Sequence, residues 1–241
     1  MVNLKFQIDK EEDIKIWLHF LNNKEKRTSY GHDRLSGLPK EFLDSVLDKP
    51  EDKQRKVILS YIEKYYAPKY IDKFKSESYN KIKDNLDAII SALEMLHNRK
   101  LPVKNIIVKY ETFNCCPYIW QGKESDTFGL FFARYVLDRG SEVAVFCHEV
   151  MHLFFHFYFF DYCLSKGLTR NQAMDLKEAV TVLLNLDPTL SKLLGTGITD
   201  YGHKGHKLLR QTITDIYNSQ EEKDFQKLLD VAIENMKKQN I

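Results

Sequence analysis

The chain has 241 residues, which is enough for one large domain or for a core domain with a helical extension. Hydrophobic residues make up 43% of the chain and charged residues 29%, as in an ordinary soluble globular protein. Because the formal net charge is only +2, the composition gives no indication of a nucleic-acid partner, and we expect none.

The N-terminal sequence and the cysteines favour a reducing compartment. The first fifteen residues contain no apolar segment typical of a secretory signal. The chain has four cysteines, but their spacing matches no disulfide framework and no CxxC pair occurs. We therefore expect a cytoplasmic protein.

The first hundred residues are expected to form a helical N-terminal region. Asp9 and Glu12 suit the start of a helix, and the apolar residues that follow recur at helical spacing. Apolar residues from Ile82 to Leu96, at steps of three and four, predict a long amphipathic helix. The helices expected here are one that begins after Asp9, and others at 40–47, 51–66 and 70–99.

The composition changes after Pro102, where β-branched and aromatic residues become frequent. Segments 103–113 and 126–137 are expected to be strands, with 114–125 as a loop between them. Two interpretations of 126–134 stay open. It is either an edge strand that offers its backbone to an extended peptide, or an interior strand with a bulge at Gly129.

The remainder of the chain is expected to be helical. Thr169 and Gln172 match a capping box at the start of one helix, which ends before Pro188. The expected helices are 141–164, 170–186, 204–218 and 221–238. Together these elements predict a predominantly helical α+β protein, divided into an N-terminal region at 1–100 and a second domain at 101–241.

His148, Glu149 and His152 form an HExxH motif in the apolar helix expected at 141–164. Residues four apart on a helix lie on one face, so both imidazoles can reach one ion. Glu149 is about 100° further round the helix, close to a water that the ion would hold. Imidazole suits zinc, and a catalytic zinc site commonly has three protein ligands and one water. The alternative is a core helix whose histidines bond to the backbone or to each other.

The third ligand must come from outside the motif. His156 is about 12 Å along the helix from His148, which is too far for both to bind one ion, so we interpret His156 as a core or outer-sphere histidine. The following helix returns antiparallel and brings Glu178 level with the two histidines.

An unpaired Glu178 among apolar neighbours would be costly, and metal ligation accounts for it. Asp175, one turn earlier, is the reserve ligand. The alternative is a glutamate at the helix surface that pairs with Lys177 or Arg170.

HExxH followed by a glutamate on the next helix resembles the gluzincin branch of the zinc metallopeptidases. The likeness covers 141–186 and, more loosely, 103–206. It is strongest to small bacterial cytosolic proteins in which HExxH precedes a helix like KEAVTVLLN and a GYxxH turn; this chain has His203 where that turn has tyrosine. The resemblance implies a zincin-like catalytic domain, Zn²⁺ held by His148, His152 and Glu178, and a peptide or protein substrate.

Peptide hydrolysis at such a site needs a proton acceptor and a donor for the oxyanion. Glu149 is the expected general base. The segment DYGHKGH supplies three candidate donors: His206, which is favoured because a helix follows it directly, then Tyr201 and His203. The alternative is an exposed polar turn with incidental histidines.

Other functional classes stay open. Residues 143–164 are long and apolar enough to span a bilayer, but the chain has no second such segment to shield an ion, so we expect a buried central helix and no membrane. A non-catalytic, zinc-stabilised binding or scaffold protein is the main alternative, and a metallohydrolase that cleaves another bond is the next. The presence of Glu149 favours a hydrolase, because a structural zinc site has no use for it.

Overall fold

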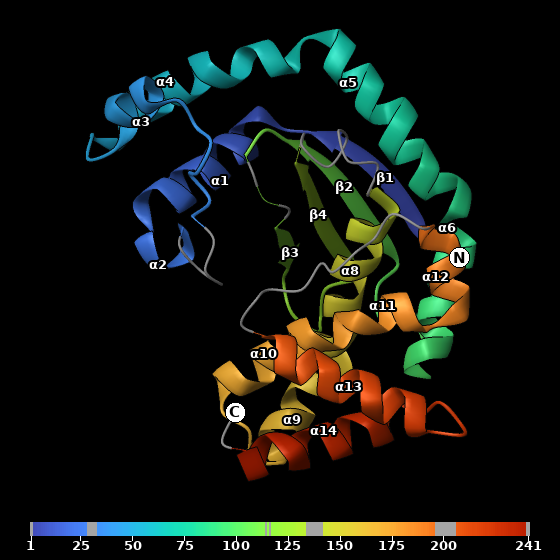
Figure 1. Ribbon diagram of the computed structural model, residues 1–241. Helices are drawn as coiled ribbons and strands as arrows, with labels where there is room; N and C mark the ends of the chain where they lie inside the picture. The colour runs from blue at the N-terminus through green and yellow to red at the C-terminus, as the bar shows by residue number, and fades with distance from the viewer. Residues whose placement is uncertain are drawn as a thin grey trace.

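The structure is a computed structural model that describes residues 2–27, 33–113, 115, 117–133, 142–195 and 206–239. It is a mostly helical α+β fold with one mixed sheet of four strands, which confirms the predicted fold class. The strands are β1 (Asn3–Ile8), β2 (Asn105–Glu111), β3 (Tyr118–Trp120) and β4 (Thr127–Ala133). Figure 1 shows the helices from α3 to α6 as an arch around the sheet, with α10, α13 and α14 grouped at the opposite end.

Helical segments in the first hundred residues are α1 (Lys10–Asn22), α2 (Lys24–Arg27), α3 (Lys40–Val46), α4 (Glu51–Ile62), η2 (Glu63–Tyr66), α5 (Pro68–Phe74), η3 (Lys75–Tyr79) and α6 (Asn80–His97). Those after the sheet are α8 (Glu142–Phe154), η4 (Phe155–Phe159), α9 (Phe160–Ser165), α10 (Arg170–Ala179), η5 (Val180–Val182), α11 (Leu183–Leu186), α12 (Pro188–Leu194), α13 (Lys207–Ser219) and α14 (Phe225–Gln239). Here η2 and η5 are 3₁₀ turns, and η3 and η4 are π-helical turns within longer helices.

Local side-chain signals explain where several helices begin. Asp9 caps α1 by accepting hydrogen bonds from the N–H groups of Glu11 and Glu12. Thr169 and Gln172 form the predicted capping box of α10. Asp187 caps α12, a short helix that the sequence analysis does not expect, and Pro188 occupies its first turn.

The sheet has the strand order β1-β2-β4-β3, in which β1, β2 and β4 are parallel and β3 runs antiparallel to β4 (Figure 1). Segment 126–134 therefore contains an interior strand, and its interpretation as the edge strand is wrong. Gly129 pairs with Ile119 in an unbroken register, so the expected bulge is absent from this pairing. The edge beside β4 is formed by β3, from the segment expected to be a loop.

The N-terminal hundred residues are not purely helical, because β1 pairs along its length with β2. Helix α1 is also attached to the end of β2: Asp13 accepts hydrogen bonds from the N–H and the hydroxyl of Thr112 at 3.2 and 2.8 Å. The sheet thus includes residues from both sides of the predicted boundary at residue 100.

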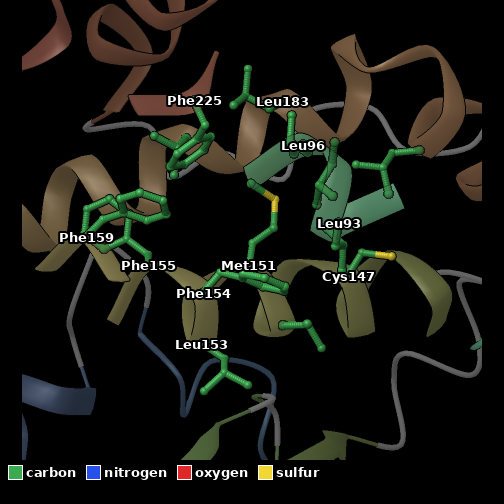
Figure 2. Packing of buried hydrophobic residues seen from close by; sticks show 14 of the residues in the cluster. Leu93, Leu96, Cys147, Met151, Leu153, Phe154, Phe155, Phe159, Leu183 and Phe225 are labelled. Atoms are coloured by element: carbon green, nitrogen blue, oxygen red, sulfur yellow. The ribbon is translucent and has the colours of Figure 1, made fainter. Parts of the chain in front are cut away.

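Helix α8 lies in the main hydrophobic core, as expected of a central helix. Figure 2 shows Met151 directed toward Leu93 and Leu96 of α6, whereas Leu153 points to the other side of α8. A second, smaller core cluster joins α1, α3 and α4 around Trp17. By length and composition Glu142–Ser165 could cross a membrane, but 72% of its apolar window is buried within the protein.

Candidate metal centre

Two neighbouring helices carry the HExxH motif and the predicted third ligand. His148, Glu149 and His152 lie in the second half of α8, and Glu178 lies in the last turn of α10. One nitrogen of each histidine and one oxygen of Glu178 are all within 4.8 Å of one another. The structure therefore brings the three predicted ligands together as one group.

The distances in this group are those expected around one small ion. His148 Nε2 is 3.6 Å and His152 Nε2 is 3.3 Å from Oε2 of Glu178. Two atoms that are each bonded to a zinc ion at a tetrahedral angle lie about 3.3 Å apart. Two imidazole nitrogens and one carboxylate oxygen are also a donor set that zinc accepts, so the residues fit the metal.

The three side chains differ in exposure, which shows where the group can be reached. The side chain of His148 is 17% exposed, compared with 3% for His152 and 9% for Glu178. Ligand access is therefore from the side of His148. Within the described residues, Nδ1 of each histidine has no hydrogen-bond partner.

The protonation states suit metal ligation. Burial holds the pKa of His152 well below its ordinary value, so its imidazole is neutral, as a ligand must be. Burial raises the pKa of Glu178, but His152, hydrogen bonds from both histidines and the charge of Lys177 outweigh that effect, and the net direction is downward. Glu178 is therefore a carboxylate.

Glu149 is buried beside the group and has the pKa of a potential proton acceptor. Burial raises this pKa to about 7, assisted by Glu178 and opposed by His148, Lys177 and Arg34. A carboxyl group that titrates near neutral pH can accept a proton and release it again. Arg34 belongs to the N-terminal region, and sequence reasoning gave it no role here.

The candidate oxyanion donors divide into two groups. His206 lies directly before α13, is 8% exposed, and its Nε2 is 3.0 Å from Oδ1 of Asp175. Asp175 thus contacts His206. It is not part of the group formed by the three predicted ligands, so its prediction as the reserve ligand is not confirmed. Tyr201 and His203 lie outside the described residues.

Behind Glu178 lie three residues whose connection sequence reasoning missed. Lys177 Nζ is 2.8 Å from Oε1 of Glu178 and 3.3 Å from the hydroxyl of Tyr118 on β3, which in turn lies 2.6 Å from Nε2 of His156. His156 is an outer histidine, as expected. Glu178 does pair with Lys177, as the alternative predicts. The predicted place of this pair at the helix surface is wrong, because Lys177 is only 3% exposed.

Comparison with family models, curated proteins and solved structures found no match to this chain. The fold and the side chains define an α+β protein with a candidate metal centre of two histidines and one glutamate.

Proposed function

We propose that the protein is a zinc-dependent metallopeptidase whose zincin-like domain comprises 101–241 together with strand β1. The observation that carries this proposal is the convergence of His148, His152 and Glu178 on one point, with Glu149 buried beside them. A structural zinc site prefers four protein ligands, whereas a catalytic site has three and leaves one position open. Three ligands with an adjacent carboxyl group thus favour catalysis over a scaffold role.

The residues around the site have separate roles in this proposal. Zinc, when bound, polarises the substrate carbonyl and lowers the pKa of a bound water. Glu149 accepts a proton from the attacking water and donates it to the leaving amine. His206, with both ring nitrogens protonated, donates one hydrogen bond to Asp175 and the other to the developing oxyanion. Tyr201 and His203 remain the other proposed donors.

The edge strand supports a peptide or protein as the substrate. Strand β3 has one side paired with β4, and its middle residue Ile119 is 45% exposed. Tyr118 on the same strand packs 5.9 Å from the ring of His152. An extended peptide that paired with β3 would therefore pass close to the metal ligands. A cytoplasmic location, and the absence of nucleic-acid and membrane partners, remain predictions from the sequence.

The replacement Glu149→Gln tests the proposed function. It removes the proton acceptor but keeps the size and polarity of the side chain, so we expect zinc to be retained and peptide hydrolysis to fall by at least about 100-fold. A mixed library of unstructured peptides, analysed by mass spectrometry, provides the assay. Glu234→Gln, at an exposed position of α14, is the matched control.

The two alternatives give different results in this experiment. A zinc-stabilised scaffold binds zinc but cleaves no peptide in either form. A metallohydrolase for another bond also leaves the peptides intact, yet hydrolyses ester or amide model substrates in a manner that depends on Glu149. Either pattern contradicts the peptidase proposal.

A further inference from the structure

Lys177 is a buried cation placed directly against a predicted metal ligand. Its side chain is 3% exposed, which is rare for lysine without a charged partner. Burial opposes the charged form, but Glu178 and Tyr118 reverse that effect, and the pKa of Lys177 is raised. Its Nζ lies 2.8 Å from Oε1 of Glu178, so Lys177 is an ammonium group that pairs with a buried carboxylate of the candidate metal centre.

The two carboxylate oxygens of Glu178 face different partners. Oε1 lies 2.8 Å from Nζ of Lys177, whereas Oε2 lies 3.3 and 3.6 Å from the two histidine nitrogens. A carboxylate held in this way offers only one oxygen to an ion. The hydrogen bond to Lys177 opposes rotation that would present both oxygens.

A chain of hydrogen bonds fixes Lys177 in turn. Lys177 has donors only, so the hydroxyl of Tyr118 accepts from it at 3.3 Å. The Tyr118 proton is then directed to Nε2 of His156 at 2.6 Å, which requires a neutral imidazole. Burial, supported by the charge of Lys177, lowers the pKa of His156 to about 4, so the imidazole is neutral at pH 7. The chain links β3, η4 and α10 behind the site.

We propose that Lys177 is a positioning residue with two effects: it restricts Glu178 to ligation through Oε2, and it supplies the counter-charge that keeps the metal-free site folded. This inference rests on the proposed zinc site. Without metal, Lys177 is the cation 2.8 Å from the buried carboxylate. With metal bound, the ion is a second cation beside Glu178, so the stability of the folded protein depends less on Lys177.

The replacement Lys177→Met tests both effects because it removes the charge and keeps the length of the side chain. In the presence of a chelator, we expect the midpoint of thermal unfolding to fall by about 10 °C, because Glu178 is left buried without its cation. Saturating zinc should reduce this difference to less than half. Lys177→Arg keeps a charged donor and should stay close to the wild type in both conditions.

Ligation of Glu178 is read from the absorption of the protein loaded with Co²⁺ in place of zinc. Two histidines, one carboxylate oxygen and one water give four-coordinate cobalt, which absorbs more strongly in the visible range than five-coordinate cobalt. Lys177→Met removes the hydrogen bond to Oε1 that opposes two-oxygen ligation, so we expect weaker visible absorption, with recovery in Lys177→Arg. If the methionine variant does not fold, Lys177→Gln, which is neutral but polar, takes its place.

Lys123→Met is the matched control, because Lys123 forms an ion pair with Asp161 at the surface. If zinc stabilises the wild type but the variants at position 177 behave like this control, the role of Lys177 is contradicted and the metal centre is not. A wild type whose unfolding midpoint does not change with zinc contradicts the metal centre itself, and this inference with it. Zinc-dependent rescue together with the cobalt change supports the inference.

Discussion

Nε2 of His206 lies 3.0 Å from Oδ1 of Asp175, three residues before the predicted metal ligand Glu178. The contact connects the start of α13 to the helix that carries Glu178. It also gives one nitrogen of the imidazole a fixed partner. The orientation of the His206 ring is thus fixed from α10, and its role as oxyanion donor remains part of the proposed function.

Replacement of His206 by alanine should lower kcat and leave the metal in place. Loss of one oxyanion donor typically lowers kcat by about 100- to 1,000-fold. Asp175→Asn should give a smaller loss, because the ring remains but is held less firmly. Steady-state kinetics and zinc content of each variant check this prediction, with Asp215→Asn on the exposed side of α13 as the control. Loss of zinc from His206→Ala would contradict the assigned role.

His97 should make the protein less stable as the pH falls from 6.5 to about 4. Its ring is buried, donates from Nδ1 to the carbonyl oxygen of Leu93 at 2.7 Å, and stacks on Phe154. Burial lowers its pKa from 6.5 to about 4, so the unfolded chain takes up the proton first as the pH falls. The contribution of His97 to the free energy of unfolding is fully present above pH 6.5. About 3 kcal/mol of it is lost when the pH reaches 4.

The replacement His97→Phe keeps the stacking and removes the titrating group. Urea unfolding at pH 7 and at pH 4.5 gives the free energy of unfolding that each protein loses between the two pH values. This loss should be about 2–3 kcal/mol smaller in the variant than in the wild type. An equal loss in both proteins would show that His97 is not the group responsible.

Glu111 at the end of β2 should destabilise the protein at neutral pH. It is completely buried, and neither carboxylate oxygen has a hydrogen-bond partner in the part of the chain that the structure describes. Burial and the nearby Asp13 raise its pKa well above 4.5, with Arg34 opposing. The folded state therefore binds the proton more tightly than the unfolded state, and stability falls as the pH rises above 4.5.

Glu111→Gln should consequently raise the free energy of unfolding at pH 7 and have little effect at pH 4. Glu94→Gln provides a control of opposite sign. Glu94 accepts hydrogen bonds from Lys100 and the Leu101 N–H, and its pKa is lowered despite partial burial. That variant should be less stable at pH 7. A stabilising effect of Glu111→Gln that persists at pH 4 would contradict the titration argument.

Truncation of Met151 should destabilise the core beside the helix that carries the predicted metal ligands His148 and His152. Met151 is 1% exposed on α8, between His148 and His152 in the sequence, and points toward α6 (Figure 2). Met151→Ala should cost about 2–5 kcal/mol, because the cavity cannot close fully. Met95→Ala on α6, where the side chain is 70% exposed, should have almost no effect. Thermal unfolding of both variants makes the comparison.

The sequence allowed the helical half of the fold and the ligand group to be predicted, because both depend on local spacing. The i,i+4 spacing of His148 and His152 and the capping box at Thr169 are short-range signals. They were sufficient to place Glu178 opposite the histidines.

The remaining features depend on contacts between distant residues. Strand β1 is stabilised by β2, a hundred residues away, and β3 has only three residues after Pro117. The link from Lys177 to Tyr118 joins positions 59 apart. No periodicity in the sequence indicates such pairs, so the alternative in which Glu178 pairs with Lys177 predicts that pair at the helix surface.

Zinc content after equilibrium dialysis measures the central claim most directly. The wild-type chain should retain one zinc ion per molecule. His148→Ala, His152→Ala and Glu178→Ala should each lose most of it, whereas Glu149→Gln and His156→Gln should keep it. Zinc that stays at wild-type levels in all three ligand variants, or is absent from the wild type, would contradict the metal centre.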